Sequence, residues 1–283
     1  MGFEFVLSDY LVCVGAMAFF SVALSELVRA SHTGLPKSAL GSLFLLVAGA
    51  CFGSLGASGE TTPLEVIRAF LSLSNIVSVQ GLSLLLIVTI IVYLAATLHP
   101  GESDVPTRVI CLFGAVVSLV LCAYLLYHTV QLGEMSSRGM ALYAVAFVTN
   151  AMVTGFTLFV ISCQFDLGAE EVSPGERTLV LVACAMQVVA FDCFTASFLL
   201  QLSTGGMLVP SELVGTSVSA LWSSFAVVGL GGTLVAGVAF YRAKAAQHRA
   251  QRERTVLLCL LGCSVASGIM LQGILQLSNW WTA

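Results

Sequence analysis

The chain has 283 residues, of which 58% are apolar and only 9% are charged, with a formal net charge of -4. Its mean hydropathy is +0.99. So few charged groups cannot solvate the surface of a globular protein of this length, and the composition therefore excludes a water-soluble protein. We also expect no nucleic-acid partner. The apolar residues come in blocks of about 20, which is the length that a helix needs to cross the hydrocarbon core of a bilayer.

These blocks predict an all-α, polytopic transmembrane helix bundle that forms a single integral membrane domain over residues 1–283. Turn-forming residues between the blocks, such as His99-Pro100-Gly101 and Ser173-Pro174-Gly175, support the division. The first block is expected to stay as a membrane anchor, because acidic and not basic residues precede it. The predicted spans lie near residues 9–30, 39–58, 76–98, 108–132, 140–164, 178–202, 214–241 and 255–277.

The basic residues predict the orientation of these spans, since short loops rich in Lys and Arg stay in the cytoplasm. The odd-numbered connections hold nine of the eleven basic residues, and the even-numbered connections hold only Arg68 and Arg138. We therefore expect both termini outside, in the plasma membrane of a prokaryote. The cluster at 242–254 is interpreted as a determinant of topology, and a specific site for anionic lipids is the alternative. The nine are Arg29, Lys37, Arg108, Arg177, Arg242, Lys244, Arg249, Arg252 and Arg254.

The nine cysteines all fall inside predicted spans, where thiols usually serve as small apolar packing groups. Cys259 and Cys263 share a helix face but lack the further ligands that a metal site requires, so no metal site is expected. Iron–sulfur ligation needs runs of cysteine that the chain lacks. Of the four histidines, only His128 lies within a span, and one histidine cannot supply both axial ligands of a haem. We expect neither haem nor an iron–sulfur cluster in this chain.

Asp192 lies in the middle of the sixth predicted span, where a charged side chain costs about 3 kcal/mol to insert and therefore indicates a function. Two interpretations stay open: a relay for protons through the membrane, and a protonated side chain that only hydrogen-bonds to a neighbouring helix. The intramembrane amides, among them Asn150 and Gln187, are interpreted as hydrogen-bonding links between helices. The small residues of Gly49-x-x-x-Gly53 are interpreted as a helix-packing face.

The outer connection 59–74 contains a Thr-Pro entry signal followed by apolar and charged residues at helical spacing. This pattern predicts a short helix at the membrane surface, where a lipid-soluble headgroup or a docked partner would be met.

The run from Phe52 to Gly81 resembles the segment between the second and third spans of the membrane anchor subunits of dimethyl sulfoxide reductases. The likeness includes Phe-Gly-Ser-Leu-Gly-Ala-Ser-Gly-Glu-Thr-Thr-Pro, the Arg-Ala-Phe helix and Ser78-Val79-Gln80-Gly81. The ending from Ser267 to Gln276 is similar to the Gly-rich close of that family. The resemblance implies a membrane anchor for a four-cluster iron–sulfur subunit and a molybdopterin catalytic subunit on the outer face. It also implies oxidation of menaquinol in anaerobic respiration.

Some residues depart from the family pattern at the quinol site. The family's histidine falls at Gly59 or at Ser54, its glutamate at Gly81, and its arginine at Gln272. As replacements we propose a quinol-binding set made of Glu60, Glu65, His128 and Gln80. Histidine titrates near neutral pH and suits acceptance of a quinol proton, and the glutamine amide can hydrogen-bond to a quinone carbonyl.

Two other functions remain open. A secondary transporter would also use many spans and an intramembrane acid such as Asp192, although it should show inverted repeats, and none is found. A structural anchor without quinol chemistry agrees with the missing family residues. Neither the terminal electron acceptor nor the direction of electron flow can be read from the sequence.

Overall fold

The computed structural model describes residues 3–28, 35–58, 78–98, 105–131, 137–164, 174–204, 219–243 and 249–280. Apart from single turn or bend residues at two helix ends, all of these are helical, and these ranges contain no strand. Only the backbone is described for residues 3–6, 54–58, 128–131, 137, 140, 198, 201–204, 219, 221, 249–250 and 272–280.

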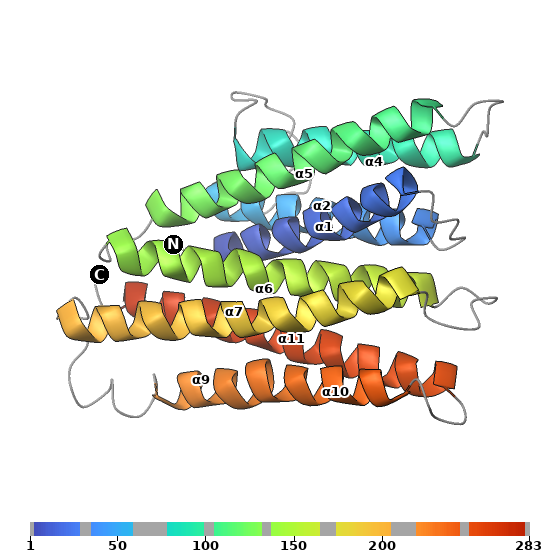
Figure 1. Cartoon of the computed structure of the whole chain (residues 1–283). Helices are drawn as coiled ribbons and strands as arrows, with labels where there is room; N and C mark the ends of the chain where they lie inside the picture. Colours follow the sequence, from blue (N-terminus) through green and yellow to red (C-terminus); the bar gives the residue numbers. More distant parts are fainter. Residues whose placement is uncertain are drawn as a thin grey trace. The chain divides into compact units, whose positions relative to one another are not determined.

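Seven helices and one composite helix form the described part of the chain (Figure 1). The composite helix joins α9 (Ser219–Ser224), the π-helix η2 (Phe225–Gly232) and α10 (Thr233–Ala243) without a break. The others are α1 (Phe3–Leu27), α2 (Leu35–Ser58), α4 (Val79–Leu98), α5 (Val105–Gln131), α6 (Ser137–Gln164), α7 (Pro174–Thr204) and α11 (Arg249–Trp280).

Eight stretches of these helices are long and apolar enough to cross a membrane, which confirms the predicted all-α architecture with eight spans. They start and end within about eight residues of the predicted limits. Pro36, Pro106 and Pro174 lie in the first turns of α2, α5 and α7, where a missing backbone N–H costs nothing. The outer connection and the surface helix predicted within 59–74 lie outside the described residues, and the orientation of the termini stays a prediction.

Large apolar side chains are exposed along the spans, as the membrane interpretation requires. Phe44, Val227 and Val235 are about 70% exposed, at 72%, 69% and 70%. A water-soluble protein exposes single apolar residues, but α2, α4, α5, α7 and α10 each expose several large ones. Because lipid tails tolerate such surfaces, the chain is a multi-pass membrane protein.

The helices fall into two compact units, residues 2–125 with 161–169 and residues 126–160 with 170–283, which are described separately. In the first unit α1 and α2 cross closely at the predicted small-residue face. A Cβ on Gly49 would lie 2.8 Å from Val12 Cγ2, and one on Gly53 would lie 2.7 Å from Ser8 Oγ. The Ser8 hydroxyl donates a hydrogen bond to the Gly49 carbonyl at 2.7 Å. Gly49-x-x-x-Gly53 is therefore a packing face.

The core of this unit is built around Phe19 and Tyr93, both fully buried, whose rings meet edge to face at 5.9 Å. Gly114 of α5 leaves no room for a side chain beside the Phe19 ring. The Tyr93 hydroxyl donates to Glu26 Oε1 at 2.9 Å.

In the second unit, hydrogen bonds from side chain to backbone join helices that are far apart in sequence. The Ser197 hydroxyl of α7 donates to the Gly139 carbonyl of α6 at 2.7 Å. The Tyr143 hydroxyl of α6 donates to the Leu271 carbonyl of α11 at 2.9 Å. These bonds fix how far α7 and α11 are shifted along their axes relative to α6. The position of α7 matters because it carries the candidate site described next.

Candidate functional site

Asp192 lies on α7, 18 residues after Pro174 and 12 before Thr204, inside the candidate span Pro174–Ser197. At about 1.5 Å of rise per residue, it is far from both ends of the helix. Its side chain is exposed, and it forms no hydrogen bond with any described residue. The interpretation of Asp192 as a side chain that only links two helices therefore has no support in the described part of the chain. An exposed acid at this depth is available to a ligand or a partner.

Aromatic rings from α7, α9 and η2 form a cluster around Phe191, the residue that precedes Asp192. Phe191 stacks on Phe225, with ring centroids 5.8 Å apart and planes 18° apart, and lies 6.0 Å from the Trp222 ring. Phe194 meets Phe225 edge to face at 5.1 Å. Phe225 is fully buried, whereas Phe191 and Trp222 are half-buried. Asp192 is thus the next residue in the sequence after Phe191, one of the half-buried rings of this aromatic cluster.

One hydrogen bond holds the rim of this cluster in place. The Trp222 indole N–H donates to the hydroxyl of Thr195 at 3.3 Å. Thr195 lies three residues after Asp192, so both side chains lie on the same side of α7. The hydrogen bond therefore ties the indole to the side of α7 that carries Asp192 and satisfies the indole nitrogen.

The π-helix η2 gives the seventh span its close contact with α11. A Cβ on Gly229 would lie 2.7 Å from Ser267 Oγ, and one on Gly232 would lie 2.7 Å from Cys263 Sγ. Glycine at both positions lets the two backbones approach. Stretches of π-helix are rare and often accompany functional sites. This one begins at Phe225, the residue that anchors the aromatic cluster.

The buried face of α7 carries an amide pair. Asn150 Nδ2 donates to Gln187 Oε1 at 3.1 Å, and both residues are fully buried. The pair joins α6 to α7, which agrees with the interpretation of these amides as links between helices. Gln187 and Asp192 are five residues apart and so point in directions about 140° apart around α7. The amide pair therefore joins α7 to α6 on one face of α7, and exposed Asp192 lies on another face.

The described residues do not test the four residues predicted to bind quinol as a set. Glu60 and Glu65 lie outside the described residues. His128 lies in α5, where only its backbone is described. Gln80 lies in the first turn of α4 and is half-buried. Gln80 belongs to the first unit, and both His128 and Asp192 belong to the second. The predicted set thus stays a prediction.

Three ionisable groups near the ends of the spans were not singled out from the sequence. Asp9, at the first residue of the predicted span 9–30, lies within α1 and the span Leu7–Leu27. Glu26 was not singled out and accepts the hydrogen bond of buried Tyr93. Glu253 of α11 is fully buried and forms an ion pair with Arg177 of α7, whose guanidinium also lies 5.4 Å from the centre of the Phe240 ring. Only three-dimensional packing reveals these partners.

The described cysteines are free thiols, and most are buried. Cys13 and Cys122 lie 3.5 Å apart between α1 and α5, and Cys184 and Cys263 pack against glycines. Among the residues with a described position, no three His, Cys, Asp or Glu side chains are grouped so that they could hold a metal ion.

Comparisons of the chain with protein-family models, with curated proteins and with solved structures each gave no match.

Proposed function

We propose that this chain is the membrane anchor subunit of a molybdopterin-containing reductase of the dimethyl sulfoxide reductase kind, and that it binds and oxidises menaquinol. The electrons pass to a four-cluster iron–sulfur subunit and then to the molybdopterin catalytic subunit, both on the outer face of a prokaryotic plasma membrane. The proposal rests on the resemblance of residues 52–81 and of the chain's ending to that family. Eight apolar spans agree with it.

The observation that carries the proposal is that exposed Asp192 follows Phe191, which with Trp222 forms the half-buried part of the aromatic cluster. A quinol headgroup is a flat, lipid-soluble ring with two hydroxyl groups. Stacked or tilted aromatic side chains favour a flat ring, and a carboxylate can accept its proton. Oxidation of one menaquinol to menaquinone releases two protons and two electrons. Asp192 accepts one proton, and the iron–sulfur partner takes the electrons.

This assignment gives Asp192 the role of proton acceptor, for which Glu60, Glu65 and His128 were predicted from the sequence. His128 of the same unit remains the candidate for the second proton acceptor, and Glu60, Glu65 and Gln80 stay predictions.

The test is quinol oxidation by the intact complex in native membranes, with Asp192→Asn as the main variant. Asparagine keeps the shape of the side chain but cannot take the proton, so we expect the rate to fall by at least about a hundredfold while a quinol analogue still binds. Phe191→Leu should weaken binding of the analogue. Phe44→Leu removes an aromatic ring that is 72% exposed on α2 and should change neither.

A wild-type rate in Asp192→Asn would remove Asp192 from the quinol site. Unchanged binding in Phe191→Leu would remove the aromatic cluster. If no analogue binds to the wild-type complex, the chain is an anchor without quinol chemistry.

A secondary transporter is the second candidate, and the π-helix is the observation that favours it. Transporters place irregular helices at the substrate site, and η2 packs on α7 through Phe225 and Phe191 next to Asp192. A transporter would purify without an iron–sulfur or molybdenum subunit, whereas an anchor would not.

A further inference from the structure

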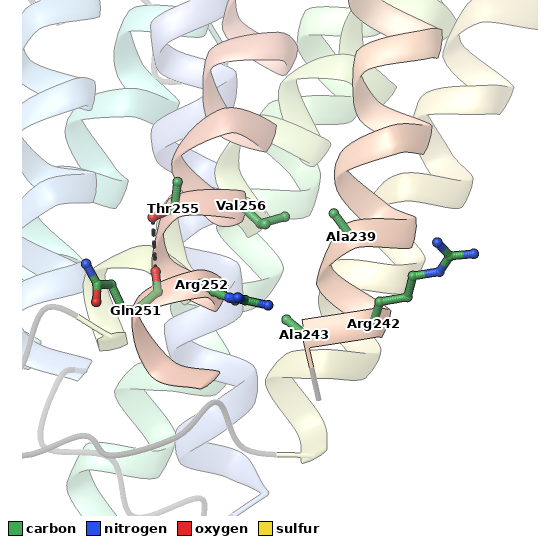
Figure 2. Close-up of a pocket in the computed structure, with 7 residues that line it drawn as sticks. All are labelled: Ala239, Arg242, Ala243, Gln251, Arg252, Thr255 and Val256. Atoms are coloured by element: carbon green, nitrogen blue, oxygen red, sulfur yellow. Dashed lines mark hydrogen bonds between the residues drawn. The ribbon is translucent and has the colours of Figure 1, made fainter. Parts of the chain in front are cut away.

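A groove opens between α10 and the first turns of α11, two helices of the same unit (Figure 2). Its volume is about 620 Å³. The polar side chains that line it are Arg242, Gln251, Arg252 and Thr255. Two residues of the basic cluster at 242–254, Arg242 and Arg252, thus line one groove.

The two arginines give the groove its charge. Both Arg242 and Arg252 are exposed, and neither forms an ion pair with a described residue. Arg177 of the same unit differs, because its charge is balanced by buried Glu253. In Figure 2, Arg252 extends from α11 toward α10, whereas the exposed side chain of Arg242 extends from α10 away from α11. The groove therefore presents positive charge that the described protein does not neutralise.

The start of α11 adds to this charge. Arg252 lies in the first turn of a helix of 32 residues, where the helix dipole already favours anions. A cation at this end is unfavourable unless an anion is bound nearby. The Thr255 hydroxyl donates to the Gln251 carbonyl at 3.0 Å, so its proton is in use, and the remaining donors that line the groove are the two arginines and the Gln251 amide.

The depth of the groove and its apolar walls indicate where the anion comes from. The candidate spans Trp222–Ala243 and Gln251–Leu271 both end at the groove, which therefore lies at the membrane boundary. Ala239, Ala243 and Val256 form its apolar side. Tyr241, which is 69% exposed, lies at the same end of α10, as tyrosines at membrane interfaces do. A free phosphate would not cover this apolar side of the groove, whereas the acyl chains of a lipid would.

We propose that the groove between α10 and α11 binds the phosphate group of an anionic membrane lipid through Arg252, and that the exposed side chain of Arg242 turns toward the same phosphate when the lipid is bound. The lipid's chains then lie along the apolar side of the groove and the exposed surface of α10. Small basic pockets between transmembrane helices are suited to such headgroups. The site is independent of quinol binding, because none of its residues belongs to the Asp192 cluster.

The test is native mass spectrometry of the purified protein titrated with phosphatidylglycerol, with phosphatidylcholine as the comparison lipid of no net charge. We expect a saturable phosphatidylglycerol adduct, weakened about fivefold in Arg242→Gln or Arg252→Gln and about 25-fold in the double variant. Arg138→Gln removes an exposed arginine of α6 and is the matched control, which should bind like wild type. Arg252→Lys should retain most of the binding, because the charge remains.

Three results would overturn the proposal. Equal weakening in Arg138→Gln would show attraction to overall charge and not to a site. Wild-type binding in the double variant would remove the two arginines from the site. Displacement of the lipid by inorganic phosphate at equal concentration would assign the groove to a free anion. Melting temperatures of all variants, measured without lipid, separate loss of binding from loss of fold.

Discussion

The buried ion pair between Arg177 and Glu253 should be a major contributor to the stability of the second unit. The Glu253 side chain is fully buried and that of Arg177 is only 15% exposed, so water screens the pair weakly. Removing one member of such a pair costs about 3–5 kcal/mol, because the other charge stays buried. We therefore expect Arg177→Leu to lower the melting temperature by roughly 10 °C, given about 2–4 °C for each kcal/mol in a chain of this size.

The double variant Arg177→Leu with Glu253→Leu distinguishes a coupled pair from two independent side chains. With both charges gone, no buried charge is left uncompensated, so most of the lost stability should return. The melting temperature in mild detergent, taken at one heating rate for all variants, is the measurement. Arg138→Leu, at an exposed position on α6, is the control and should change stability by less than about 0.5 kcal/mol. Additive losses in the double variant would show that the two side chains are not coupled.

Two further predictions concern helix packing. Gly49→Val should lower stability by about 1–3 kcal/mol, because its Cβ would lie 2.8 Å from Val12, whereas Gly41→Ala on the same helix meets nothing within 4 Å and should be tolerated. A Gly49→Val melting temperature equal to that of Gly41→Ala would contradict the close crossing of α1 and α2. Asn150→Leu should lower stability by about 1 kcal/mol through loss of its bond to Gln187, and a thermal shift below about 1 °C would speak against that link.

The number of spans could be predicted from the sequence because it depends on a local quantity, the length of an apolar run. The beginnings of three helices follow from Pro36, Pro106 and Pro174, which are local signals too. Even the crossing of α1 and α2 was predictable in part, since Gly49-x-x-x-Gly53 permits close approach, although the partner residues were not.

Features that depend on the neighbouring helix could not be predicted. Arg177 counted as a loop charge that sets topology, yet its partner Glu253 lies 76 residues further along the chain. The sequence placed Asp192 inside a span but could not indicate which side of α7 packs against other helices and which side is exposed. The π-helix η2 left only a weak signal in Gly229, Gly231 and Gly232, because glycines also serve simple packing.

The proposed role of this chain as the membrane anchor of a reductase can be tested by its partners. The tagged protein is purified in mild detergent from anaerobically grown cells, and the chains that accompany it are identified. We predict an iron–sulfur subunit and a molybdopterin subunit in fixed ratio to this chain. Recovery of the chain alone, from cells in which the tagged protein is intact and folded, would contradict the proposed role.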